Sequence, residues 1–285
     1  MNTAPEHGGN MLPDDFQFTQ SNLQDYLTCP RRFDLRYRQR LQWPAVQTAP
    51  VQESERRMKL GSDFHYLAHQ HALGMPLPAL TALAENDPSP ELGAMWRSYL
   101  AHRPTELSAA GVRLFPEVTL ATVLNGWRLA AKFDLLAAQP DGRVLIVDWK
   151  TNLRRPRSDR LRARAQSRVY PLVLAKAGES LLGQPVPADA ITLVYWFTAA
   201  PADPEIIPYG AAQLAADESF LADLIARIAA ADTFPLTDDD RPCRFCAFRS
   251  FCERGDVAGP LDEFEDDFAF DDFDLDWEQV SEIEF

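Results

Sequence analysis

The stretch Val144-Leu145-Ile146-Val147-Asp148-Trp149-Lys150-Thr151-Asn152 predicts a strand that ends in an acid and a lysine separated by one residue. Side chains alternate across a strand, so Asp148 and Lys150 should point to one side while Val147 and Trp149 point to the other. Burying two charges at the end of a core strand is costly unless they are paired or bind a metal. By itself, the stretch indicates either a functional site or an ordinary salt bridge on a solvated strand face.

Two further strands are expected immediately before this one. Residues 112–124 and 127–138 have apolar strand patterns and flank Asn125-Gly126, a pair typical of the tight primed turns of β-hairpins. A second turn leads into the opening strand, so the three strands are predicted to form a meander. Asp134 lies in the middle strand, next to the strand that carries Asp148.

Helices are expected before and after the meander. A capping-box pattern from Ser21 to Gln24 opens a short helix that should stop near Cys29-Pro30. Pro171 should bend the helix in which it lies, or end its first half. The other expected helices cover residues 31–40, 53–73, 76–85, 91–102, 158–177 and 211–231, with one more strand at 191–198. Helices that bracket a small mixed sheet indicate an α/β or α+β domain with a largely helical N-terminal part.

The net charge of −14 is unevenly placed along the 285 residues. Twelve of the 42 acidic residues lie in residues 261–285, which hold no Lys or Arg, so the first 260 residues carry 30 acidic against 28 basic groups. This nearly neutral part contains two arginine clusters, which indicate either a phosphate-binding surface or solvated helix faces. The clusters are Arg31, Arg32, Arg36, Arg38 and Arg40, and Arg154, Arg155, Arg157, Arg160, Arg162, Arg164 and Arg168.

The sequence indicates a cytoplasmic protein. A hydrophobic content of 46% allows a sizeable core. The longest uncharged apolar run, residues 190–200, is too short to span a bilayer, and the first residues lack the pattern of a secretion signal. We therefore expect a protein without a membrane partner, in a compartment where thiols stay reduced.

Four cysteines form the second informative pattern. Cys243-x2-Cys246-x5-Cys252 places three thiols in one compact loop, and Cys29 lies far earlier in the chain. In a reducing compartment this pattern favours a bound metal or cluster over disulfides. Zinc fits four thiolates, although its usual signature is two CxxC pairs, and free buried thiols are the remaining alternative.

Asp134, Asp148 and Lys150 together place two carboxylates on adjacent strands beside an ammonium group. Hard oxygen ligands suit Mg²⁺ or Mn²⁺, and a cation held there can polarise a phosphodiester. Lys150 could then orient the attacking water or neutralise charge in the transition state.

This arrangement resembles the PD-(D/E)xK nuclease superfamily, whose hallmark is an Asp followed by (D/E)-x-K at the end of the next strand. Here the first element is Phe133-Asp134 and the second is Asp148-Trp149-Lys150. The resemblance implies a restriction-endonuclease-like mixed sheet flanked by helices. Glu117, after Pro116, also matches a recurrent acid of the family, to which no role is assigned.

The resemblance extends to the RecB-like branch, which includes CRISPR-adaptation nucleases and the AddB subunit of a bacterial recombination nuclease. Gly61 and His65 match its helical Gly-x3-His, and Gln166 and Tyr170 match its Gln-x3-Tyr. The resemblance implies that His65, Asp134, Asp148 and the Trp149 carbonyl hold Mg²⁺ or Mn²⁺, that Lys150 assists the attacking water, and that Gln166 and Tyr170 flank the site. His69 and His71 match nothing and are expected to be structural.

The cysteine pattern is similar to the iron-sulfur subset of the same branch. That similarity implies that Cys29, Cys243, Cys246 and Cys252 hold a four-iron four-sulfur cluster, with zinc as the alternative. The cluster would join the N-terminal helix to the later cysteine loop.

The expected organisation is a disordered segment at residues 1–17, a nuclease domain at 18–255 and a disordered acidic-aromatic segment at 256–285. The expected function is metal-dependent hydrolysis of DNA, as an exonuclease on single strands in repair, recombination or CRISPR-type DNA processing. The alternative is a DNA- or protein-binding module of the same fold that recruits a repair partner through the acidic segment.

Acids alternate with aromatic residues in the segment 261–285. Solvating disorder has few aromatics, so the composition favours binding. The segment is expected to lie in the basic channel as a DNA mimic or to dock on a partner protein. A solubilising segment with no specific partner is the alternative.

Overall fold

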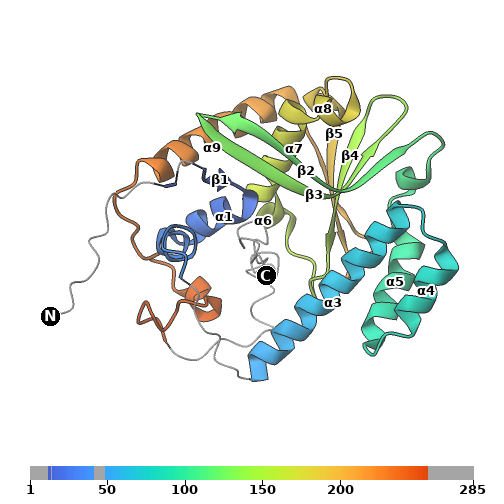
Figure 1. The fold of residues 1–285 in the computed structure, drawn as a ribbon, viewed down its shortest axis with the longest axis horizontal. Helices are drawn as coiled ribbons and strands as arrows, with labels where there is room; N and C mark the ends of the chain where they lie inside the picture. The colour runs from blue at the N-terminus through green and yellow to red at the C-terminus, as the bar shows by residue number, and fades with distance from the viewer. Residues whose placement is uncertain (1–11, 14, 42–48, 256–285) are drawn as a thin grey trace, which may run out of the picture.

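A six-stranded mixed sheet forms the centre of the protein, with helices on both faces (Figure 1). The computed structural model describes residues 12–13, 15–41 and 49–255. This architecture confirms the expected α/β class. The strands are β1 (Gln17–Phe18), β2 (Arg113–Leu124), β3 (Trp127–Ala138), β4 (Val144–Lys150), β5 (Ile191–Phe197) and β6 (Glu205–Pro208).

The predicted meander is present. β2 pairs antiparallel with β3 across Asn125 and Gly126, whose positive φ angles of 52° and 81° suit the expected primed turn. β3 pairs antiparallel with β4, which continues parallel to β5, and β5 pairs antiparallel with β6. β1 and β6 were not predicted, because two and four residues are too short for an alternating pattern to stand out.

One edge of β3 is shared by two strands. β2 covers the other edge from end to end, while β1 pairs only at Arg128 and Leu129 and β4 pairs only from Leu135 onward. Among the described strands, none therefore pairs with residues 130–134 on the shared edge. The sheet is open between β1 and β4, and Asp134 lies at one border of this opening.

Two helical layers cover the sheet (Figure 1). On one face, Phe64, Trp96 and Tyr99 pack against β4 and β5. On the other face, Val169 and Leu221 belong to the core cluster that includes the opposite side of the same strands. The first layer contains α3 (Ala49–Ala72), α4 (Leu77–Glu85) and α5 (Pro90–His102), and the second contains α1 (Gln20–Thr28), α7 (Ala165–Ala177) and α9 (Ala211–Ala229).

The remaining helices are short. They are α2 (Pro30–Phe33), η1 (Asp34–Arg38), η2 (Thr105–Ser108), α6 (Ser158–Ala163), α8 (Glu179–Leu182), η3 (Ala188–Ala190) and η4 (Arg241–Phe245). The expected helix at 31–40 is an α-helical turn, α2, followed by a π-helical turn, η1. Within the described ranges, no helix combines the length and apolarity needed to cross a membrane.

Two local predictions are wrong. The N-cap of α1 is Thr19, two residues before the predicted Ser21, and it exchanges hydrogen bonds with Asn22 in a capping box. The helix predicted at 158–177 breaks at Arg164, where ψ is 147°, and not at Pro171. α7 continues through Pro171 because that residue is buried among core side chains that hold the helix on the sheet.

The packed part of the chain begins before the predicted domain boundary at residue 18. Leu12 and Phe16 are buried in the core, and the ring of Phe16 contacts those of Phe18 and Phe33. The predictions for residues 1–11 and 256–285 lie outside the described residues. The segment between the predicted helices at 31–40 and 53–73 is described only as far as Leu41 and again from Ala49, where α3 has already begun.

Candidate active site

Glu117 on β2 and Asp134 on β3 lie opposite each other. At this point the alternation of β3 side chains between the two core layers is interrupted. Pro116 pairs with Leu135 and Val118 pairs with Phe133, so the two acids occupy the interval between these pairs. Phe133 packs in the α7 layer but Leu135 packs in the α3 layer, although strict alternation would place them on one face. Glu117 has a φ of 52°, which is rare for a residue other than glycine and costs backbone energy.

Both acids line a groove of about 670 Å³ at the opening in the sheet. One wall comes from α3, and the other comes from the start of α1 and from α7. The predicted site residues on β3, β4, α3 and α7 all line this groove. They are His65, Asp134, Asp148, Trp149, Lys150, Gln166 and Tyr170.

His65 completes a group of three potential metal ligands with Glu117 and Asp134. Its Nδ1 atom lies 3.5 Å from Oδ1 of Asp134, and one ligand atom from each of the three residues lies within 4.8 Å of the others. Ligands that share one Mg²⁺ ion lie no more than about 4.2 Å apart, twice the metal–oxygen distance. The three side chains therefore need only a small adjustment to hold one divalent cation.

Gly61 explains how α3 carries His65 to the sheet. A Cβ atom at this position would lie 2.9 Å from Oγ1 of Thr151, which is closer than side chains normally approach. Glycine thus lets the helix pass directly against the residue that follows β4. His65 lies four residues further on, about 6 Å along the axis, and reaches Asp134.

Asp148 and Lys150 form a buried ion pair that Gln166 bridges. Nζ of Lys150 lies 2.8 Å from Oδ2 of Asp148 and donates a hydrogen bond of 3.0 Å to Oε1 of Gln166. Nε2 of Gln166 donates a hydrogen bond of 2.8 Å to Oδ1 of Asp148. The side chains of Val147 and Trp149 pack in the α3 layer, which confirms that they point away from the charged pair.

Asp134 is the link between the ion pair and the histidine. The main-chain N–H of Trp149 donates a hydrogen bond of 2.8 Å to Oδ2 of Asp134. Burial alone would raise the pKa of Asp134, but His65, this N–H and the charge of Lys150 outweigh burial and lower the pKa below its ordinary value. Asp134 is therefore a carboxylate at neutral pH, the form that binds a cation.

Burial raises the pKa of Tyr170 well above its ordinary value, and the charges of Asp148 and Asp134 raise it further. Tyr170 therefore keeps its phenolic proton and can act as a hydrogen-bond donor at the site. Its ring also contacts Phe133, next to Asp134.

The structure groups the candidate metal ligands differently from the sequence prediction. Glu117 joins His65 and Asp134, while Asp148 is engaged by Lys150 and Gln166 and does not belong to that group. The Trp149 group that contacts Asp134 is its N–H, and the expected role of its carbonyl stays a prediction. The signal for Glu117 was present in the sequence as an acid after a proline within a strand, but no spacing rule gave it a role.

Lys132 and His69 are two of the groove residues that the sequence did not predict for the site. Lys132 pairs with Glu117 at 2.7 Å, so an ammonium group neutralises this acid in the absence of a cation. His69, expected to be structural, lines the groove one helical turn beyond His65. His71 lies away from the groove, with Nδ1 2.9 Å from the hydroxyl of Tyr99.

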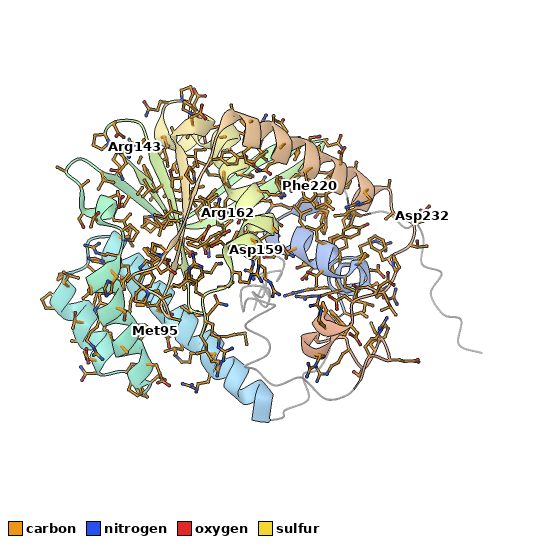
Figure 2. All side chains as sticks on the ribbon, turned by 180° about the vertical axis from the view of Figure 1, so that it is seen from behind. Met95, Arg143, Asp159, Arg162, Phe220 and Asp232 are labelled. Atoms are coloured by element: carbon orange, nitrogen blue, oxygen red, sulfur yellow. The ribbon has the colours of Figure 1, made fainter. Side chains whose placement is uncertain are left out.

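The two arginine clusters are largely engaged by carboxylates. Asp25 and Asp34 each pair with two arginines of the first cluster. Glu205 holds Arg155 and Arg162 of the second, and Figure 2 shows Arg162 and Asp159 on α6. Arg164 is the member that lines the groove, so the structure does not support the expectation that both clusters are dedicated phosphate-binding surfaces. The other long basic side chains in the groove are Arg56, Arg57, Lys59, Lys132 and Lys150.

The four cysteines line one small cavity of about 20 Å³, and all four are free thiols. Cys29 caps the C-terminal end of α1, while the other three come from the loop at residues 243–252. Burial raises the pKa of Cys243 and Cys252, and the neighbouring thiols raise it further. These groups would ionise only with a cation present to stabilise the thiolates.

Comparison with known proteins matches residues 17–253 to the PD-(D/E)XK nuclease superfamily. No curated protein matches the chain. Among solved structures, a candidate exonuclease from Eubacterium rectale is 11% identical, with a TM-score of 0.50 over 91% of this chain and 95% of that chain. SSO0001 is 13% identical over 88% of each chain, with a TM-score of 0.37. At this identity the first likeness supports the fold alone, and the second is too distant to support an argument.

The superfamily match spans β3, β4, the helix of His65 and the cysteine loop. It implies a DNA substrate. The chain therefore belongs to the PD-(D/E)XK nuclease superfamily and is a nuclease that hydrolyses phosphodiester bonds.

Proposed function

We propose that this chain is a Mg²⁺- or Mn²⁺-dependent exonuclease of the RecB-like branch that digests single-stranded DNA. The observation that carries the proposal is the placement of three potential ligands, from His65, Glu117 and Asp134, in the same groove as the buried Lys150. The assignment as an exonuclease agrees with the name of the Eubacterium rectale protein, whose fold is similar. DNA repair or a related processing pathway is the setting that the branch implies.

The residues of this chain divide the work of hydrolysis. His65, Glu117 and Asp134 would hold the divalent cation, with Asp148 beside them. When bound, the cation supplies Lewis-acid polarisation of the scissile phosphodiester. Lys150 directs an ammonium group into the groove, where it can orient the attacking water and offset negative charge in the transition state.

Gln166 and Asp148 fix the position of Lys150 before the substrate arrives. The amide accepts from Lys150 and donates to Asp148, so rotation of either charged side chain would break a hydrogen bond. Positioned groups of this kind avoid the cost of reorganisation during the reaction. Tyr170, which stays protonated, can donate to a phosphate oxygen on the same side.

The groove suits one strand better than two. Its volume of about 670 Å³ is that of a typical small-ligand site. A few nucleotides of one strand fill a space of this size. Arg56, Arg57, Lys59 and Arg164 along the walls can contact the backbone phosphates.

A four-iron four-sulfur cluster at Cys29, Cys243, Cys246 and Cys252 is part of the proposal. Around one zinc ion, tetrahedral thiolates lie about 3.8 Å apart, given a zinc–sulfur distance of about 2.3 Å. Among the described residues, no three cysteine sulfurs lie within 4.8 Å of one another. This wider spacing favours a cluster, in which each thiolate binds a different iron, over a single zinc ion.

The acidic segment at residues 261–285 would act as a competitor of DNA for the groove. The described chain stops at Gly255, close to Cys252 and hence to Cys29 at the end of α1. The start of the same helix lines the groove at Gln20 and Gln24. Replacing the segment's acids by Asn and Gln should tighten binding of single-stranded DNA at low salt. Unchanged binding would remove the segment from the mechanism.

The decisive assay incubates purified protein with end-labelled single-stranded DNA and Mn²⁺. The double variant Asp148→Ala/Lys150→Ala should lose cleavage. A matched control, Asp141→Ala/Arg143→Ala, removes one acid and one base from an exposed ion pair in the β3–β4 turn. Arg143 lies at that turn, well away from Met95 of the groove wall (Figure 2). Equal cleavage by both double variants would refute the assignment, and DNA binding without cleavage by the wild type would favour the binding-module alternative.

The cluster has an independent test. Protein purified without oxygen should absorb light at about 400 nm, as iron-sulfur clusters do. Cys29→Ser should weaken that absorption. Colourless protein with one zinc ion per chain would contradict the cluster.

A further inference from the structure

Tyr66 and Leu153 are large apolar side chains that line the groove yet remain about half exposed, at 53% and 50%. Exposing an aromatic ring to water forgoes the stabilisation that its burial would give. Within the described part of the chain, the ring of Tyr66 stacks on no other ring and its hydroxyl makes no hydrogen bond. Among the described residues, Tyr66 therefore presents a flat aromatic surface without a ring or hydrogen-bond partner inside the proposed substrate groove.

Tyr66 lies next to one of the three potential metal ligands. Tyr66 follows His65 directly on α3, and His65 reaches Asp134. The close contact between Gly61 and Thr151 holds α3 against the end of β4. Tyr66 is one residue beyond His65, about 1.5 Å further along the helix axis.

The surroundings of the ring suit a nucleotide strand. Arg56, Arg57 and Lys59 lie on the preceding turns of the same helix and line the same groove. Cations that follow the phosphates combined with an aromatic ring that receives a base are the recurring features of single-strand binding sites. In a duplex, by contrast, the bases are paired and stacked on each other, so their faces are not available to a side chain.

We propose that Tyr66 is the stacking platform for an unpaired base next to the scissile phosphate, and that it makes this nuclease selective for single strands. The inference rests on the proposed function, because it takes the groove to be the substrate site. Leu153, in the loop after β4, lines the same groove and provides an apolar contact for the sugar or base edge. Tyr66 contributes to affinity and strand selectivity and leaves the hydrolytic step to Lys150 and the ligand group.

The test compares Tyr66→Ala, Tyr66→Phe and a control, Leu83→Ala, which truncates an α4 side chain of the same 53% exposure outside the groove. Loss of one stacked base should raise KM for single-stranded DNA about 5- to 150-fold in Tyr66→Ala, with a smaller effect on kcat. Tyr66→Phe should retain most of the affinity because the ring remains. Leu83→Ala should behave as the wild type.

Abasic substrates sharpen the test. Moving a single abasic nucleotide along the strand should reveal one position next to the cleaved bond at which the wild type loses affinity and Tyr66→Ala does not. Equal sensitivity of the two proteins at every position, or an unchanged KM in Tyr66→Ala, would overturn the platform.

A binding measurement separates this inference from the proposed function. Binding of a fluorescent single-stranded oligonucleotide without divalent cations requires no cleavage. Weaker binding by Tyr66→Ala but not by Tyr66→Phe supports the platform even if the protein proves not to cleave DNA. Equal binding by all variants contradicts the platform even if cleavage is observed.

Discussion

Removing either member of the Asp148–Lys150 pair should destabilise the protein far more than removing both. Lys150 is 2% exposed and Asp148 is 3% exposed, and their charged atoms are 2.8 Å apart. Lys150→Met leaves the carboxylate buried with Gln166 as its remaining hydrogen-bond donor in the trio. Asp148→Asn removes the carboxylate that forms the ion pair with the buried ammonium. In both cases an uncompensated charge or an added proton must be accommodated in the core.

The expected magnitude follows from the burial of the pair. Breaking a buried ion pair from one side costs about 3–5 kcal/mol, while replacing both partners by neutral groups of similar size is often close to neutral. Gln166 can still bond the partner that remains, which places each single variant near the lower end, about 3 kcal/mol. The coupling energy between the two substitutions should then be at least about 3 kcal/mol, a large share of a typical stability of about 5–15 kcal/mol.

Urea denaturation at pH 7 with EDTA measures this coupling without a contribution from bound cations. The four proteins are the wild type, Lys150→Met, Asp148→Asn and the double variant. The exposed pair Asp141 and Arg143 serves as a control that should show little coupling. Effects that add within about 0.5 kcal/mol would show that the two charges do not depend on each other, and the account of the site would be wrong.

Two further predictions concern the contact between α3 and the end of β4, and the ion pairs of Glu205 on β6. Gly61→Ala should reduce kcat by about 10- to 100-fold, because the added Cβ would lie 2.9 Å from Thr151 Oγ1 and would displace His65. Adding Thr151→Ala should restore activity to that of Thr151→Ala alone. Full activity of Gly61→Ala would contradict the close contact. Burial raises the pKa of Glu205, but hydrogen bonds from Ser158 and Arg162 and the charges of Arg162 and Arg155 outweigh burial and hold the pKa below its ordinary value. Its stabilising effect is therefore present at neutral pH and is lost as pH falls through the folded-state pKa, so the difference in urea midpoint between the wild type and Glu205→Gln should shrink below about pH 4. A difference that stays constant between pH 3 and 7 would argue against that assignment.

The sequence predicted the parts of the site that depend on local pattern. Alternation along the strand at 144–150 placed Asp148 and Lys150 on one side and Trp149 on the other, and the structure has this arrangement. The Asn125-Gly126 turn and the second turn, before residue 144, define the meander, which places β3, the strand of Asp134, beside β4. These inferences succeeded because alternation with a period of two is typical of a strand, and Asn-Gly between two such segments is typical of a hairpin turn.

The remaining features depend on contacts between distant parts of the chain. The place of Glu117 in the ligand group follows from its left-handed backbone, which no pattern of residue types revealed. The arginine clusters suggested phosphate binding, but acids far away in the sequence, such as Glu205, pair with several members. The break at Arg164 is likewise set by tertiary contacts, since the N–H of Ala165 donates to Gln24 on α1.

Direct titration with Mn²⁺ tests the central claim, that His65, Glu117 and Asp134 form the metal site of this nuclease. Binding is measured on the wild type, Glu117→Gln, Asp134→Asn and Asp159→Asn, with DNA cleavage followed in the same samples. Asp159 is an exposed acid on α6 that pairs with Arg157 and serves as the control. The account predicts that Glu117→Gln and Asp134→Asn weaken Mn²⁺ binding at least about 10-fold, in line with the loss of a ligand, and lose cleavage in parallel, while Asp159→Asn is unchanged. Wild-type Mn²⁺ affinity in Asp134→Asn would contradict it.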